Sequence, residues 1–358
     1  MYQDLQILET ESAEKYLIRC NDQSMYVGYL VKSIIEFLQE NKNHDEIIDL
    51  IIKKHNVRIG LGNIIEVENK LIQFLEKGQA TASFYKLFKI LDPCKINLPS
   101  RFYNIFSSKL FYLSLTLLTL LSVVIYFSSE DYGVNGVYEK TFFFLMLFII
   151  LFLHELGHAF AARKYHVDVR ELGFGFYFIV PVLYVNLNEI WKLNNFKRII
   201  INLSGIFVQF FLGLVLFFLS LIFKNQENIF ISLFNLNLFI IIINLNPFLK
   251  FDGYWVLSDI LNENNLMGKS NSMMLNLFLI KKIKSTKVII IYTLLRFVFI
   301  IYILYKLIIY LVNGYKYLRY YKTFEWSIVL PMIIVLLFII RIIYKITQNE
   351  YKRKKRSF

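Results

Sequence analysis

The sequence contains few cysteines, only Cys20 and Cys94 among its 358 residues. They are far apart in the chain, and neither has neighbours that resemble a disulfide framework or a cysteine zinc site, so we expect two reduced cytosolic thiols. An early apolar stretch is also lacking, because the first one long enough to insert begins near Lys109. No cleavable signal peptide is therefore visible, and the membrane helices themselves are expected to direct insertion.

Charged residues make up only 19% of the chain, whereas 56% of the residues are hydrophobic. This composition is too apolar for a soluble protein and indicates residence in a lipid bilayer. The net charge of +13 comes from Lys and Arg gathered between the apolar runs and in residues 352–356, where anionic headgroups account for it. The aromatic residues lie inside the apolar runs, where they pack against lipid or helices, so we expect no nucleic-acid partner.

The chain beyond residue 100 contains six apolar runs that each approach the ~20 residues needed to cross the hydrocarbon core. The runs are roughly Leu110 to Phe127, Phe142 to Ala162, Ile199 to Phe223, Ile229 to Phe248, Val288 to Val312 and Trp326 to Tyr344. They predict a mainly α fold, a polytopic bundle of about six membrane helices.

The spacers between these runs indicate the orientation of the chain in the cell membrane. The first spacer carries Glu130, Asp131 and Glu139, whereas basic residues follow the second run, so the positive-inside rule places both termini in the cytoplasm. One feature opposes this topology, because the external loop from Tyr315 to Glu325 is basic. Arg296 within the fifth run is costly in lipid, which weakens the assignment of that run as a membrane span.

Residues 1–100 are mixed in polarity and predict a small cytosolic α+β domain, followed by a membrane domain over residues 101–358. Two short strands, at 16–19 and 25–29, precede three stretches with helical periodicity at 31–39, 45–54 and 63–77. Gly78 is placed to cap the last of these helices. Further along, the segment from Glu171 to Trp191 is too polar and glycine-rich for a helix, so we expect a hairpin or re-entrant loop there.

The string His154-Glu155-Leu156-Gly157-His158 ends the second apolar run. Positions i and i+4 share one helix face, so both imidazoles can bind one metal ion while Glu155 acts as general base. Zinc suits such ligands and lowers the pKa of water towards neutrality. The motif also occurs by chance in soluble helices, but ionisable groups within a membrane segment indicate function.

Catalytic zinc usually has three protein ligands, and the third must come from elsewhere in the chain. The best candidate is Asp252, which follows Asn246 and Pro247 at the end of the fourth run. Proline ends the regular helix and Gly253 permits a sharp turn, so Asp252 can approach the histidines. The alternative is that Asp252 serves only as a helix cap.

Together these residues strongly resemble the site-2 protease family of intramembrane metalloproteases, over about residues 142–258. The resemblance implies Zn²⁺ bound by His154, His158 and Asp252, a catalytic Glu155, and a peptide or membrane-protein substrate. Asn246 would shape the turn before Asp252 and is a candidate substrate contact. No PDZ-like external insertion is expected, because the external loops are too short.

The family often shows A-G-P-x-x-N on the intervening helix, and here the corresponding residues run from Ser204 to Gln209. Gln209 keeps an amide but the proline is absent, which puts direct transfer of the asparagine's role in doubt. Gln209 remains a candidate contact for the substrate backbone or oxyanion, and Asn202 lies seven residues earlier on the same face. Either amide could instead bond to a neighbouring helix.

The N-terminal region resembles the PqqD-like winged-helix domain that binds leader peptides during maturation of ribosomally made peptides. That resemblance implies a leader peptide, or export machinery, as a partner, with the peptide added to an exposed strand between residues 16 and 29. A helical domain that only stabilises the enzyme is the alternative.

Three functions are therefore weighed. The first is a zinc endopeptidase that processes a membrane-inserted or membrane-delivered peptide, such as a precursor during maturation or export. The second is a non-hydrolytic zinc-containing membrane protein that binds peptide for export or immunity. An intact Glu155 favours the first, since a structural site needs no general base. A cation transporter is disfavoured because no inverted repeat is evident.

Overall fold

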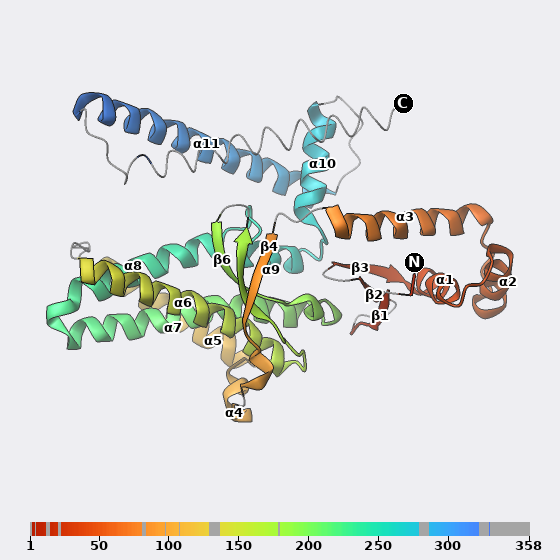
Figure 1. Cartoon of the computed structure of the whole chain (residues 1–358), viewed down its shortest axis with the longest axis horizontal. Helices are drawn as coiled ribbons and strands as arrows, with labels where there is room; N and C mark the ends of the chain where they lie inside the picture. Colours follow the sequence, from red (N-terminus) through yellow and green to blue (C-terminus); the bar gives the residue numbers. More distant parts are fainter. Residues whose placement is uncertain are drawn as a thin grey trace. The chain divides into compact units, whose positions relative to one another are not determined.

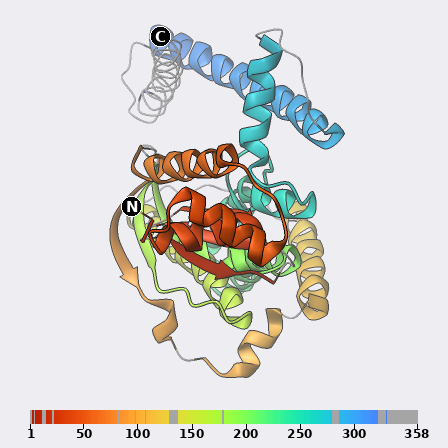
Figure 2. The ribbon, with the colours of Figure 1, turned by 90° about the vertical axis from the view of Figure 1, so that its right-hand side faces the viewer.

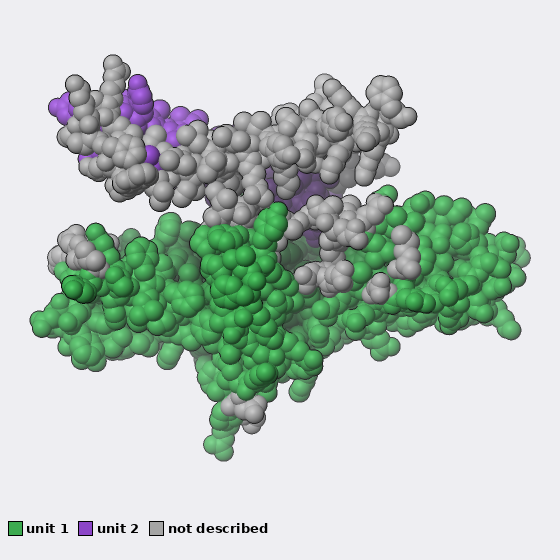
Figure 3. Space-filling view, in the orientation of Figure 1, with its two compact units in different colours: residues 1–264 green, residues 265–358 purple. Residues whose placement is uncertain are grey.

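The structure is a computed structural model of the whole chain. It describes residues 2–3, 5–11, 15–20, 23–80, 84–96, 98–106, 108–128, 137–177, 180–278, 286–321 and 329. The chain divides into two compact units, Met1–Asn264 and Asn265–Phe358, which Figure 3 colours separately. The predicted boundary at residue 100 remains a prediction.

An antiparallel sheet and three helices make up the N-terminal region (Figures 1 and 2). The strands are β1 (Gln6–Glu9), β2 (Lys15–Cys20) and β3 (Gln23–Gly28), and the helices are α1 (Tyr29–Gln39), α2 (His44–His55) and α3 (Leu61–Ala80). The two predicted strands and three predicted helices are confirmed, whereas β1 was not predicted. Gly78 does not cap α3, because the helix continues through it to Ala80.

The sheet of the N-terminal region has two differently covered faces, because side chains alternate along a strand. Ile18 and Val27 pack with residues of α1, α2 and α3 in one apolar core. Leu17 pairs with Tyr26 across β2 and β3, so both point to the opposite face. Leu17 is nevertheless only 1% exposed, which means that this second face is also covered.

A second three-stranded sheet joins two distant segments of the chain, in the order β4-β5-β6. β4 (Phe84–Leu91) was not predicted, whereas β5 (Leu172–Tyr177) and β6 (Val180–Val185) form the predicted hairpin. Pro181 lies within β6, which is tolerated because β6 is an edge strand. Glu171 holds the strands together, since it accepts hydrogen bonds from Lys86 of β4 and Tyr184 of β6.

Five described helices are long and apolar enough to cross a membrane. They comprise α5 (Ser108–Ser128), α6 (Val137–Lys164), α7 (Asn195–Ile222), α8 (Glu227–Asn244, with the preceding turn η4, Lys224–Gln226) and α11 (Lys287–Tyr321). They match the first five predicted runs, while the sixth falls outside the described residues apart from residue 329. The prediction of a polytopic helical bundle with a small N-terminal α+β region is confirmed.

Helix α7 packs against α5, α6, α8 and the short helix α9 (Asp252–Ile260). Figure 1 shows α6, α7 and α8 running side by side. Gly157 of α6 lets the helices approach closely, because a Cβ there would lie 2.8 Å from the Ser204 carbonyl oxygen of α7. Small residues at such contacts allow close van der Waals packing, which drives helix association within lipid where the hydrophobic effect between helices is absent.

The remaining elements are short connections and the helices of the second unit. The connections are η1 (Pro93–Lys95), α4 (Ser100–Tyr103), η2 (Asn104–Phe106) and η3 (Asn188–Lys192). In the second unit, α10 (Leu266–Phe278) packs against α11. Arg296 of α11 donates to the Asn271 side chain at 2.6 Å and to the Ser270 hydroxyl at 3.2 Å, which offsets the cost of this cation within an apolar helix.

Candidate metal centre

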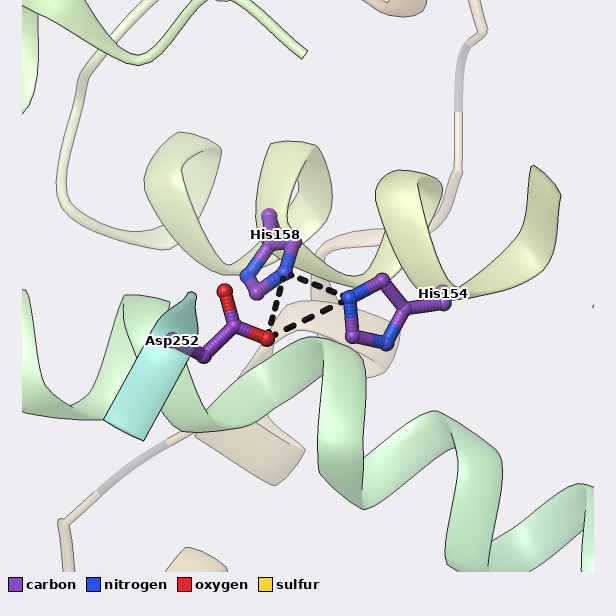
Figure 4. Close-up of side chains that lie close together, drawn as sticks. All are labelled: His154, His158 and Asp252. Atoms are coloured by element: carbon purple, nitrogen blue, oxygen red, sulfur yellow. Dashed lines mark hydrogen bonds and ion pairs between the residues drawn. The ribbon is translucent and has the colours of Figure 1, made fainter. Parts of the chain in front are cut away.

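His154 and His158 lie one turn apart near the end of α6, and both side chains are buried. Their Nε2 atoms are 3.1 Å apart (Figure 4). The Nδ1 atom of His158 lies 2.8 Å from the Ile201 carbonyl oxygen of α7, to which it donates as N–H. Such a bond orients the ring and leaves Nε2 with a free lone pair for a metal ion.

Asp252 approaches the same point from a different segment, as the first residue of α9 (Figure 4). Its Oδ2 atom lies 3.3 Å from His154 Nε2 and 3.5 Å from His158 Nε2. The cap residue of α9 is Phe251, so Asp252 does not occupy the cap position considered as its alternative role. A histidine pair and a carboxylate from two distant segments therefore converge on one small volume.

The shape of this cluster fits zinc. Tetrahedral zinc with ligand bonds of about 2.0–2.2 Å places neighbouring ligand atoms about 3.3–3.6 Å apart. The three atoms here are separated by 3.1, 3.3 and 3.5 Å. Asp252 Oδ2 is buried without a hydrogen-bond partner among the described residues, an arrangement that is costly unless a cation lies nearby.

Glu155 follows the first histidine and is half-buried. The backbone N–H of Val185, the last residue of β6, lies beside its carboxylate. The hairpin therefore contacts the candidate general base as well as covering that end of α6. Sequence reasoning placed a hairpin beside the site but did not identify this contact, which has no local sequence signal.

Gly205 of α7 allows the two imidazoles to lie against the helix backbone. A Cβ at this position would lie 2.5 Å from His158 Nε2 and 2.6 Å from His154 Cε1. Any larger residue would displace the rings, so glycine is required for close approach. The sequence motifs assigned Gly205 no separate role within the segment from Ser204 to Gln209, although a glycine inside a long apolar helix was the available signal.

Of the three predicted substrate contacts, Gln209 and Asn202 lie on α7, and Asn246 lies in the turn between α8 and α9. Gln209 is fully buried and bonds to α8, where its amide donates to Asn237 Oδ1 at 3.3 Å and accepts from Asn244 at 3.4 Å. Asn202 is buried on α7. Asn246 accepts a hydrogen bond from the Phe248 N–H at 2.8 Å and so forms the turn that leads towards Asp252. Their contact with substrate remains a prediction.

The chain has membrane-length helices, and one of them carries two histidines one turn apart with a glutamate beside them. An aspartate converges on the histidines, so the cluster has the features of an intramembrane metal centre. Residues 142–229, which include the His-Glu-x-x-His segment, match the model of peptidase family M50. This part of the chain is therefore similar to that family, the site-2 protease family, as the sequence motifs predicted. The family implies Zn²⁺, and the His154, His158 and Asp252 cluster fits that ion.

Two curated relatives carry related names. A Bacillus subtilis protein named "putative peptide zinc metalloprotease" is 28% identical over 163 residues, which cover 44% of this chain and 64% of the relative. A zinc metalloprotease of Methanocaldococcus jannaschii is 29% identical over 137 residues, which cover 37% of this chain and 38% of the relative. The chain thus spans less than two thirds of either relative. No solved structure matches the chain significantly.

Proposed function

We propose that this protein is a zinc metalloendopeptidase that cleaves peptide bonds in a membrane-inserted or membrane-delivered peptide. The observation that carries the proposal is the convergence of His154, His158 and Asp252, with ligand atoms all within 4.8 Å of one another, beside Glu155. The family and the relatives' names support the same chemistry. A substrate at membrane depth is supported because α6 and α7 are membrane-length helices.

His154, His158 and Asp252 hold the metal ion in this proposal. A bound zinc ion would supply Lewis-acid chemistry, polarisation of the substrate carbonyl and a lowered pKa of water. The Glu155 carboxylate accepts the proton released during attack and returns it to the leaving amine. The hydrogen bond from His158 Nδ1 to the Ile201 carbonyl oxygen holds the His158 ring in place, so that this side chain need not reorganise during the reaction.

The substrate class proposed is a ribosomally made peptide precursor that is processed during maturation or export. The N-terminal region would bind the leader part of that precursor, as its resemblance to PqqD-like domains suggests. The name of the Bacillus subtilis relative, "putative peptide zinc metalloprotease", supports a peptide as substrate.

The test of the hydrolytic function is Glu155→Gln, which removes the base but keeps the side-chain shape. We expect zinc content to remain, and turnover to fall by about 10²–10⁴-fold, the usual contribution of a general base. Mass spectrometry of membrane peptides should then show an uncleaved precursor that accumulates only in cells producing the variant. Identical peptides in both cell populations, with zinc still bound, would contradict hydrolysis and favour a non-hydrolytic peptide-binding protein.

We also propose that both termini lie in the cytoplasm, as the charge distribution predicts. The exposed Lys42, between α1 and α2, is a suitable labelling site after Lys42→Cys substitution in a Cys20→Ser, Cys94→Ser background. A membrane-impermeant thiol reagent should label this cysteine only after the cells are opened. Labelling in intact cells would place the N-terminal region outside.

A further inference from the structure

Arg198, in the first turn of α7, is 4% exposed and uses every donor of its guanidinium group. Nε and one Nη2 proton bond to Asp259 Oδ1, the other Nη2 proton bonds to Asn195 Oδ1, and Nη1 donates to the Leu193 carbonyl and the Tyr26 hydroxyl. A guanidinium has five N–H donors, and these five bonds account for all of them. Such a group tolerates little displacement of its neighbours.

Asp259 ties this arginine to helix α9, whose first residue is the candidate ligand Asp252. The Arg198 and Asp259 side chains are each 5% exposed, so loss of either partner would leave a buried charge uncompensated. Asn195 adds a second link, because its Nδ2 donates to the Asp259 carbonyl oxygen at 2.9 Å. The far end of α9 is therefore fastened to the start of α7.

Helix α9 can transmit this attachment because it is short and regular. It has nine residues, and Asp259 follows Asp252 by seven positions, a span of about 10 Å at ~1.5 Å per residue. Trp255, midway along α9, packs edge-on against Trp191 of η3 with ring centroids 5.5 Å apart. Because α9 moves as one piece, a tilt of the helix at Asp259 would also displace Asp252. A metal ligand tolerates a displacement of only about 0.5 Å.

The sheet of the N-terminal region docks on the same cluster through the face that carries Tyr26. The Tyr26 hydroxyl donates to the Trp191 carbonyl oxygen at 2.5 Å and accepts from Arg198 Nη1 at 3.0 Å. Burial raises the pKa of this hydroxyl, so it stays protonated and able to donate. The same docking face includes the ion pair between Arg19 and Glu189, which does not involve α9.

We propose that Tyr26, Arg198 and Asp259 are positioning residues that couple docking of the N-terminal sheet to the placement of Asp252 at the metal centre. This proposal rests on the proposed function, because it requires the metal centre described there. It adds that docking of the N-terminal sheet regulates metal affinity at that centre. Displacement of the sheet lowers metal affinity, and metal binding strengthens the docking of the sheet, because linkage between two sites is reciprocal. A partner that binds the N-terminal region can thus change the metal centre without touching it.

The first experiment measures Zn²⁺ affinity of the full chain in detergent, by competition with a chelating dye. Asp259→Asn should weaken affinity about ten-fold, the lower range for residues that support metal ligands. Tyr26→Phe should weaken it by a smaller factor, and the double variant should match Asp259→Asn, because both changes act through Arg198. Arg19→Gln is the matched control, because it removes a partly exposed ion pair of the same docking face that contributes little to docking and does not reach α9. It should keep nearly the affinity of the original chain.

Several results would overturn the coupling. They are unchanged affinity in Asp259→Asn, equal weakening in Arg19→Gln, and losses that multiply in the double variant. Asp259→Glu, which keeps the carboxylate, should restore most of the affinity. A variant that merely unfolds would lose its circular dichroism spectrum and would not be rescued in this way.

The second experiment measures hydrogen exchange with and without Zn²⁺ in the Glu155→Gln background. Zinc should slow exchange of amides in β3 and η3 by several-fold in this background, but not when Asp259→Asn is added. Equal protection with and without Asp259→Asn would contradict the proposal. Both experiments measure binding rather than hydrolysis, so their outcome is separate from whether the protein cleaves peptides.

Discussion

Helices α6 and α9 both supply ligands to the candidate metal centre, but they position those ligands in different ways. The 28 residues of α6 carry His154 and His158 one turn apart, and helix geometry alone aligns the two rings. The nine residues of α9 carry a single ligand, whose position depends on side chains from other elements. The comparison shows that local helix geometry positions the two histidines, whereas tertiary contacts position the aspartate.

Close packing distinguishes the two halves further. The histidine rings lie against Gly205 of α7, so α6 is supported along its length by a neighbouring long helix. The start of α9 is instead held by Gly253, where an added Cβ would overlap the Leu245 carbonyl oxygen at the end of α8. Substitutions in the α6 half should therefore lower zinc affinity most, and substitutions in the α9 half should lower it less.

The largest effect is expected for His158→Ala. If about 12 kcal/mol of zinc binding is shared by three ligands, loss of one costs about 4 kcal/mol, or about a thousand-fold in affinity. Zinc retained after dialysis against graded chelator measures this loss. His166→Asn is the control, since His166 is exposed and has φ 57°, which asparagine tolerates. Unchanged zinc content in His158→Ala would contradict its role as a ligand.

A smaller loss, about a hundred-fold, is expected for Asp252→Ala. The two imidazoles remain aligned on α6, so a weakened two-ligand site persists and water can replace the carboxylate. Competition against a chelating dye measures the affinity, and Asp168→Ala, at an exposed carboxylate, is the control. If Asp252→Ala binds zinc as tightly as the original chain, a different residue supplies the third ligand.

Gly253→Ala should weaken zinc binding about ten-fold, because α9 must shift away from Leu245 while Asp252 itself is retained. Gly62→Ala in α3 is the matched control. Nothing lies within 4 Å of the added Cβ there, so that variant should keep its zinc affinity. It should also gain roughly 0.5–1 kcal/mol in the free energy of unfolding, the usual preference for alanine in a helix. Equal zinc affinity in both variants would show that α9 adjusts freely.

The smallest effect concerns the hairpin that reaches Glu155. Burial raises the pKa of Glu171, but hydrogen bonds from Tyr184, Lys86 and Asn186 outweigh it and lower the pKa below its usual range. The stabilisation is therefore present above the ordinary glutamate pKa and is lost as pH falls through the lowered value. The protection of β5 and β6 amides against hydrogen exchange, corrected for the intrinsic exchange rate at each pH, should fall on acidification, and less so in Glu171→Gln. Identical pH profiles for the two proteins would contradict this role.

Much of the fold could be predicted from residue patterns. Five membrane helices, two strands and three helices of the N-terminal region, and the hairpin before α7 all follow from hydropathy and periodicity. Gly78 shows the limit of such rules, since α3 passes through a residue that usually ends a helix. Strand β4 shows another, because its pairing partner β5 lies about 80 residues away and leaves no local signal.

The sequence by itself determined the spacing of His154, Glu155 and His158, because helical periodicity is a property of neighbouring residues. It also identified Asp252 as a candidate, through the Asn246 and Pro247 turn that precedes it. Only the tertiary structure decided that Asp252 meets the histidines, that Val185 contacts Glu155, and that Arg198 joins α9 to the N-terminal sheet. These contacts join distant segments, and packing among several elements determines them together.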